Sequence, residues 1–226
     1  MPFHPANMTY KYDADDFLFL MRACLTSLGL KFAAAKENKG LILSADGTIY
    51  RLADDYSVSF WDTLAFNVEH DEEHVVRNAK LDAFTDSLQH ILDWNKAQFS
   101  QGRSEQLIKK HQILIPLNHD AGHWSAVVLK LEVQMVGENF SLAVNCDLSI
   151  YDSLALDHDK LFVVLKELNS LIEKIIKKHT ENSKCITQGQ VFTTKRQPDV
   201  FACGAVSFDI LAKIINKQEI TLTVDE

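Results

Sequence analysis

The sequence predicts a single α+β domain in which a central mixed or antiparallel sheet is flanked by helices. Three β-rich runs, at residues 111–117, 123–133 and 142–154, follow one another along the chain and predict strands. An amphipathic segment at 159–179 and a more apolar one at 203–215 predict the flanking helices. With 226 residues, the chain is long enough to bury one core without disulfides or metals, so we expect one domain.

Residues 1–105 are expected to form a mixed but mostly helical half. An acidic helix start precedes the apolar stretch at 17–30. Residues 41–52 then predict a hairpin that turns at Asp46-Gly47, because Asp-Gly between apolar runs matches strand twist. From Glu73 to about Phe99, apolar residues return at helical spacing and predict a helix.

Residues 106–226 carry the β-rich runs and the two helices that follow them. In the segment at 159–179 the apolar residues form one helical stripe, which consists of Leu161, Val164, Leu165, Leu168, Ile172 and Ile175. Residues 188–196 predict a further strand. We expect the sheet to lie between the helix at 159–179 and the helix that Cys203 begins.

Composition and charge narrow the possible functions. The formal net charge of -8 disfavours a nucleic-acid binder or docking on an anionic membrane, and it suits a basic partner. The four cysteines form no Cys-x-x-Cys pair, so neither a zinc ribbon nor a disulfide scaffold is predicted. The sequence shows neither a secretion signal pattern nor an apolar run of membrane-spanning length. We therefore expect a soluble monomer in a reducing compartment, with no metal and no organic cofactor.

The candidate chemistry centres on Cys203, at the start of the predicted helix at 203–215. Thiol catalysis needs a thiolate, a base, a group that orients the base, and donors for the oxyanion. Free N–H groups and the dipole at a helix N-terminus favour the thiolate. Gly204 beside the thiol leaves room for a substrate backbone. The remaining cysteines lie among apolar residues and are expected to be buried and unreactive; they are Cys24, Cys146 and Cys185.

Three further residues could supply the other roles. His123 starts one β-rich run and Asp152 lies near the end of the next, so antiparallel pairing would set the carboxylate against the imidazole. Such a pair fixes the tautomer of the base and stabilises its cation. Gln197, six positions before Cys203, could turn its amide toward the oxyanion, with the Cys203 N–H as the second donor. A core histidine and a turn aspartate are the commoner readings singly, but jointly the residues predict a Cys-His-Asp site.

Three segments carry a resemblance to a known family: PLNHDAGHWSAVVL at 116–129, IYDSL at 150–154 and QPDVFACGAV at 197–206. They resemble the ubiquitin-like-protease family of clan CE cysteine peptidases, which includes SUMO proteases and bacterial effector deubiquitinases. The resemblance spans roughly residues 111–215. It implies a papain-like cysteine protease fold of the ubiquitin-like-protease type.

The family's order of site residues is His, Asp, Gln and Cys, and it carries over onto His123, Asp152, Gln197 and Cys203. Trp124 matches the family's tryptophan that covers the narrow channel for a substrate's Gly-Gly tail. The chain departs from the family at Ala202, where an aspartate is frequent. The family's second, upstream tryptophan cannot be placed, because Trp61 and Trp94 are both candidates.

The resemblance implies a cysteine isopeptidase that cleaves behind the C-terminal tail of ubiquitin or a ubiquitin-like protein. Residues 106–226 would be the catalytic half, and residues 1–105 a divergent substrate-binding half, of one catalytic domain over residues 1–226. This short domain favours a bacterial effector deubiquitinase, which would be secreted into the host cytosol. The expected partners are ubiquitin, or a related modifier, and its conjugates, since an acidic chain suits their basic patches.

Three other functions stay open. A YopJ-type acetyltransferase of the same clan would pass an acetyl group from coenzyme A through the cysteine, but those relatives typically carry Glu at the position of Asp152. The HDEEH run at 70–74 fits the H-x-x-E-H zinc peptidase arrangement; its acidity and the lack of a third ligand favour an exposed helix start. A non-enzymatic ubiquitin-binding domain is disfavoured because the triad is complete.

Overall fold

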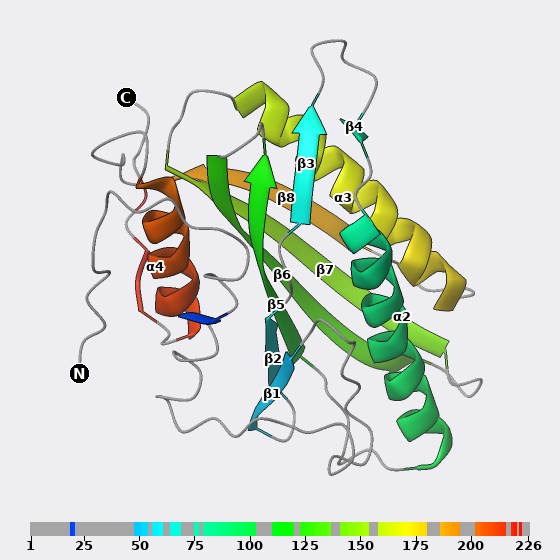
Figure 1. Cartoon of the computed structure of the whole chain (residues 1–226). Coiled ribbons are helices and arrows are strands. Elements are labelled where there is room, and N and C mark those ends of the chain that lie inside the picture. The colour runs from blue at the N-terminus through cyan, green and yellow to red at the C-terminus, as the bar shows by residue number, and fades with distance from the viewer. Residues whose placement is uncertain are drawn as a thin grey trace.

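Figure 1 shows the computed structural model of the chain: a central sheet with helices α2 (Ala79–Ser100) and α3 (His158–His179) over one face and helix α4 (Cys203–Ile215) over the other. The structure describes residues 19–20, 48–53, 56–60, 64–68, 75–76, 79–102, 110–119, 123–136, 141–153, 158–179, 186–194, 202–215, 218–220 and 222. Of the predicted helix at 17–30, only Phe19 and Leu20 are described, and both are helical. The Asp46-Gly47 turn and the HDEEH run lie outside the described residues.

Among the described residues, the sheet has eight strands in the order β1-β2-β5-β6-β7-β8, with β3 paired to β5 and to β4. In chain order they are β1 (Thr48–Ala53), β2 (Tyr56–Phe60), β3 (Leu64–Val68), β4 (Val75–Val76), β5 (Lys110–His119), β6 (His123–Val136), β7 (Ser141–Asp152) and β8 (Ile186–Thr193). Pairing is antiparallel in β1/β2, β3/β4, β5/β6 and β6/β7, and parallel in β2/β5, β3/β5 and β7/β8. The mixed sheet and its flanking helices confirm the predicted α+β class.

The first half of the chain adds strands that the sequence did not predict. Strand β1 overlaps the second arm of the predicted hairpin at 41–52, but its described partner is the following strand β2. The predicted helix from Glu73 was wrong at its start, because Val75 and Val76 pair with β3 and α2 begins only at Ala79. Two adjacent β-branched residues fit an extended backbone better than a helix.

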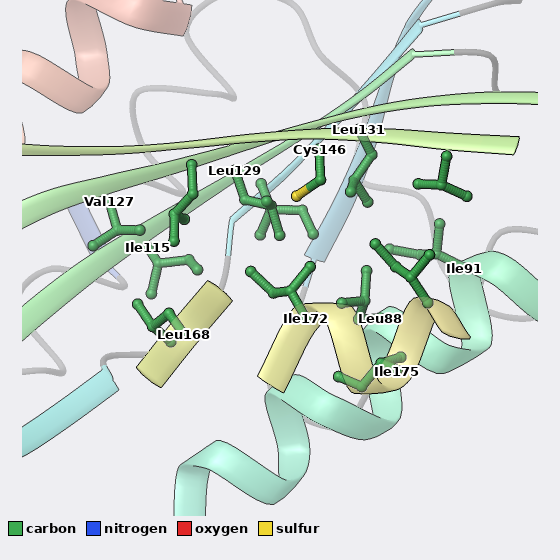
Figure 2. Close-up of a cluster of buried hydrophobic side chains, with 14 of the residues drawn as sticks. Leu88, Ile91, Ile115, Val127, Leu129, Leu131, Cys146, Leu168, Ile172 and Ile175 are labelled. Carbon is green, nitrogen blue, oxygen red and sulfur yellow. The ribbon is translucent and has the colours of Figure 1, made fainter. Parts of the chain in front are cut away.

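Apolar side chains from β5, β6 and β7 pack against α2 and α3 on one face of the sheet (Figure 2). Side chains alternate between faces along a strand, and here every second residue is buried on this side, as in Val127, Leu129 and Leu131 of β6. The helix α3 stripe predicted from the sequence is buried as a whole, with Ile176 added to it. Each fully buried aliphatic side chain contributes roughly 1.5–3 kcal/mol, so this layer fixes the position of the sheet.

A smaller apolar cluster joins the opposite face of the sheet to α4. Alternate residues of β5 and β6, such as Leu114 and Val128, pack there with Phe208 and Leu211 of the helix. The sheet therefore lies between α3 and α4, as predicted. Within the described residues, no helix has the length and apolar character needed to cross a bilayer.

Gly189 on β8 allows close approach of α3. A Cβ atom at this position would overlap with Nδ2 of Asn169 and lie 3.1 Å from both Cγ and Cδ1 of Leu165. Leu165 is buried in the core, so its side chain has little room to move.

We expect Gly189→Ala to lower the free energy of unfolding by about 1–3 kcal/mol, because overpacking strains the helix–strand contact. Urea denaturation at pH 7.5 measures the loss. The matched control is Gln190→Ala at the next, exposed position, which should change stability far less. Equal stability of the two variants would contradict this account of the packing.

His111 is a second buried feature of the sheet, on β5 opposite Leu131 of β6. It is 1% exposed, and burial lowers its pKa to about 3. In the unfolded chain a histidine has a pKa near 6.5. Between about pH 6.5 and pH 3 the unfolded state therefore binds a proton that the folded state does not, and stability falls as the pH falls.

By linkage, His111 accounts for about 2 kcal/mol of the unfolding free energy that the wild type loses between pH 7.5 and pH 5.0. We expect the His111→Gln variant to lose about 2 kcal/mol less than the wild type over the same pH interval. The measurement is urea unfolding of both proteins at the two pH values. Other titrating groups are common to both proteins and cancel in the comparison. An identical pH dependence in wild type and variant would show that His111 is protonated in the fold.

Candidate active site

The ends of three elements meet at one place: β6 begins at His123, β7 ends at Asp152, and α4 begins at Cys203. Antiparallel pairing of β6 and β7 sets Ala126 opposite Tyr151, so Asp152 lies level with Ser125 and diagonal to His123. Diagonal neighbours on one face of a sheet are within reach of a long side chain. Nε2 of His123 lies 2.6 Å from Oδ1 of Asp152.

Asp152 is anchored through both its backbone and its side chain. Its backbone carbonyl accepts hydrogen bonds from the amide and the hydroxyl of Thr194, at 2.7 Å and 3.0 Å. Its Oδ1 atom accepts a hydrogen bond from Ser125 Oγ at 2.8 Å in addition to the contact with His123. The residue is 2% exposed, and a buried carboxylate needs such donors to stay ionised.

The structure brings Cys203 to the imidazole of His123. Burial, the largest single influence, raises the pKa of the thiol, but four favourable interactions outweigh it and the pKa is lowered. They are the hydrogen bond with His123, the backbone hydrogen bonds of Trp124 and Gly204, and the attraction of the charged imidazole.

The pKa of His123 moves in the complementary direction. Burial is again the largest influence and favours the neutral ring, but hydrogen bonds to Asp152 and Cys203 and their negative charges raise the pKa to about 9. A thiol with a lowered pKa beside an imidazole with a raised one favours a thiolate–imidazolium pair. Because the two groups titrate together, their apparent pKa values belong to the pair.

Trp124 connects the nucleophile's helix to β6. Its side chain is 4% exposed and packs in the cluster that also holds Cys203. Its backbone carbonyl accepts a hydrogen bond from Ser207 Oγ at 3.0 Å. Cys203 and Ser207 are one helical turn apart, so both lie on the same face of α4. The backbone of one residue on β6 is thus bound at two points by the start of α4.

The remaining predicted residues have different outcomes. Gln197 and its proposed oxyanion role lie outside the described residues, as do Cys24, Cys185, Trp61 and the side chain of Trp94. Cys146 is a free thiol buried in the cluster under α2 and α3, as expected of a small apolar residue. In the part of the chain that the structure describes, no group of His, Cys, Asp and Glu is arranged to hold a metal ion.

Three further residues belong to this site that the sequence did not predict: Ser125, Ser207 and Thr194. Two of them carry a local signal. Ser125 is two positions after His123 and therefore shares its face of the strand. Ser207 is four positions after Cys203 and shares its face of the helix. Thr194 depends on the pairing of β8 with β7, which local spacing does not reveal.

Comparisons with known proteins give one family and a set of similar folds. No curated protein sequence matches the chain. The solved structure of the Legionella pneumophila effector protein RavZ has 12% identity and a TM-score of 0.55, and the match covers 96% of this chain and 59% of that one. This chain therefore spans less than two thirds of RavZ, and the likeness is one of fold.

Weaker structural matches include the SUMO protease Ulp1, with 14% identity, a TM-score of 0.36, and coverage of 97% of this chain and 90% of that one. The Rickettsia bellii effector protein RickCE has 22% identity and a TM-score of 0.27, with coverage of 62% and 47%. The profile described as Ulp1 protease family, C-terminal catalytic domain, matches residues 83–222. Because this match covers more than half of the chain, including His123, Asp152 and Cys203, the chain belongs to the Ulp1 protease family of clan CE cysteine proteases.

Proposed function

We propose that the chain is a cysteine isopeptidase that removes ubiquitin from proteins or from ubiquitin chains. The observation that carries the proposal is the arrangement of Cys203, His123 and Asp152. The thiol has a lowered pKa, the imidazole has a pKa of about 9, and a buried carboxylate lies 2.6 Å behind the imidazole. Membership of the Ulp1 protease family agrees with thiol chemistry on an amide.

In the first half-reaction the Cys203 thiolate attacks the carbonyl carbon of the modifier's C-terminal glycine. The His123 imidazolium then gives its proton to the departing lysine amine, and a thioester with the modifier remains. In the second half-reaction neutral His123 takes a proton from water, and the hydroxide attacks the thioester. The modifier leaves with a free carboxylate, and the thiolate–imidazolium pair is restored. Asp152 stays ionised throughout and stabilises the imidazolium.

The oxyanion and the substrate tail involve the other predicted residues. The backbone N–H of Cys203, at the start of α4, and the side-chain amide of Gln197 would donate to the oxyanion. Gly204 and Trp124, which flank the sulfur through their backbones, would border the path of a tail that has no side chains next to the scissile bond. No metal or organic cofactor takes part in this mechanism.

The choice of ubiquitin and of an effector role rests on two further arguments. The net charge of -8 is complementary to a modifier with basic patches near its tail. RavZ, a structure with a similar fold, is an effector of Legionella pneumophila, and this agrees with a bacterial effector that acts as a monomer in the host cytosol. Residues 1–105 would supply the substrate-binding half of the same catalytic domain.

We expect a ubiquitin probe with a C-terminal electrophile to form a covalent adduct with the chain at Cys203. A SUMO probe of the same chemistry is run in parallel, and mass spectrometry of the adduct identifies the modified residue. Cys203→Ala abolishes the adduct, whereas Cys146→Ala, at the buried thiol under α2 and α3, is the matched control and keeps it.

An adduct with the SUMO probe alone would replace ubiquitin by SUMO as the substrate. An adduct with neither probe would overturn the isopeptidase proposal. Transfer of an acetyl group from acetyl coenzyme A to a protein, lost in Cys203→Ala, would then favour the acetyltransferase alternative.

The pH dependence of kcat/KM tests the ion pair. Below the pKa of the thiol the sulfur is protonated, and above about pH 9 His123 has no proton for the leaving amine, so activity should fall on both sides. Asp152→Asn removes the negative charge that raises the pKa of His123. We expect its basic limb to move down from about 9 toward the ordinary histidine value, with kcat/KM at least tenfold lower.

The matched control for this experiment is Asp147→Asn, a half-buried carboxylate on the same strand. Its profile should keep both limbs of the wild type. A basic limb that stays near pH 9 in Asp152→Asn would show that Asp152 does not stabilise the imidazolium.

A further inference from the structure

Ser125 stands out among the buried polar residues because its hydroxyl contacts the triad carboxylate directly. It is completely buried and donates a hydrogen bond of 2.8 Å to Oδ1 of Asp152. The same oxygen lies 2.6 Å from Nε2 of His123. One carboxylate oxygen thus has two donors, which come from two residues on the same face of β6.

We propose that Ser125 is a positioning residue: it holds the Asp152 carboxylate in line with the imidazole and thereby raises the thiolate population of Cys203. The inference deepens the proposed function and rests on its assignment of Cys203, His123 and Asp152. In this role the residue acts through the carboxylate and not on the substrate.

The division of contacts at Asp152 supports this role. Thr194 binds the backbone carbonyl of Asp152 with two donors, so the main chain is fixed without Ser125. The carboxylate itself can still turn about its last single bond, a torsion with a broad, roughly two-fold profile. A second donor on Oδ1 from a rigid strand restricts that rotation and keeps the oxygen toward His123.

Electrostatics leads to the same expectation. Each donor to a buried carboxylate favours its ionised form, and the charge of Asp152 is one of the causes that raise the pKa of His123. The imidazolium in turn lowers the pKa of the Cys203 thiol. These linked interactions, from Asp152 through His123 to Cys203, form a relay. Loss of the Ser125 hydroxyl should therefore weaken the relay and raise the thiol pKa.

The test is the rate of alkylation of Cys203 by iodoacetamide in the full chain, measured from pH 5 to pH 10. Mass spectrometry of the Cys203 peptide keeps the other thiols out of the measurement. We expect the acid limb of the Ser125→Ala profile to lie about half a unit to one unit higher than that of wild type, so that below the thiol pKa the variant reacts roughly three- to tenfold more slowly. Ser149→Ala, a buried serine on β7, should keep the wild-type profile.

A double-mutant cycle separates a relay from a general loss of packing. If Ser125 acts through the carboxylate, Ser125→Ala changes nothing further in an Asp152→Ala background. If each substitution instead slows alkylation independently, so that the two rate reductions multiply in the double variant, the proposal is overturned. A wild-type profile in Ser125→Ala, or a shift of the thiol pKa to lower values, would also overturn it.

A second pair of variants covers the case in which Ser125→Ala does not fold. Ser125→Thr and Ser125→Val have nearly the same shape and differ by one hydroxyl. We expect the threonine variant to alkylate several-fold faster than the valine variant at pH values below the thiol pKa, and equal rates there would overturn the proposal. Iodoacetamide needs no modifier, so this measurement does not depend on the ubiquitin probe. If the probe forms no adduct, the proposed substrate is overturned, and the alkylation rates still test the role of Ser125.

Discussion

The antiparallel pairing of β6 and β7 is the interaction on which the site depends. It sets Ala126 opposite Tyr151 and so brings the end of β7 beside the start of β6. A slip of one residue would turn Asp152 to the other face of the sheet, away from His123. The same slip would take the apolar pairs of these strands, such as Val127 with Ile150, out of the core under α2 and α3. Burial of that core therefore holds the polar site in register.

The polar site has to overcome the desolvation of its charged groups, a cost that the apolar core does not have. Burial is the largest influence on both His123 and Cys203, and it disfavours the charged form of each. In the proposed thiolate–imidazolium pair, several specific contacts act together against this cost. A hydrogen bond to a charged group contributes about 1.5–3 kcal/mol, and removal of one partner from a buried pair costs about 3–5 kcal/mol. By these magnitudes, two or three such hydrogen bonds offset the cost of burying one charge. The carboxylate of Asp152 has contacts with His123 and Ser125, and its backbone carbonyl accepts a hydrogen bond from Thr194.

The second half of the fold was predictable because its patterns are long. Helix α3 keeps one apolar stripe for its whole length, and β6 and β7 are β-rich over more than ten residues each. The first half was harder to predict because β2 and β3 are only five residues long. Both strands pair in parallel with β5, which lies much later in the sequence, so local patterns do not reveal the pairing. At the site, the spacing placed His123, Asp152 and Cys203 at element ends, where the structure brings them together. Ser125 and Ser207 were missed because a serine in a strand or helix has no strong propensity, and only its distance from a site residue marks it.

The location of the site at element ends follows from the two faces of the sheet. By strand alternation His123 and Asp152 belong to the face under α2 and α3, whereas Cys203 packs with α4 on the opposite face. In the middle of the sheet the backbone layer would separate such groups. At the first residue of β6 there is no further strand residue in the way, so one imidazole can contact a carboxylate from one layer and a thiol from the other. The backbone of Trp124 and the hydroxyl of Ser207 join the two layers at this point, and the hydroxyl of Ser125 secures the carboxylate on its own side. A relay that crosses a sheet thus requires a strand end, and this constraint explains why all three side chains lie at the first or last residue of their elements.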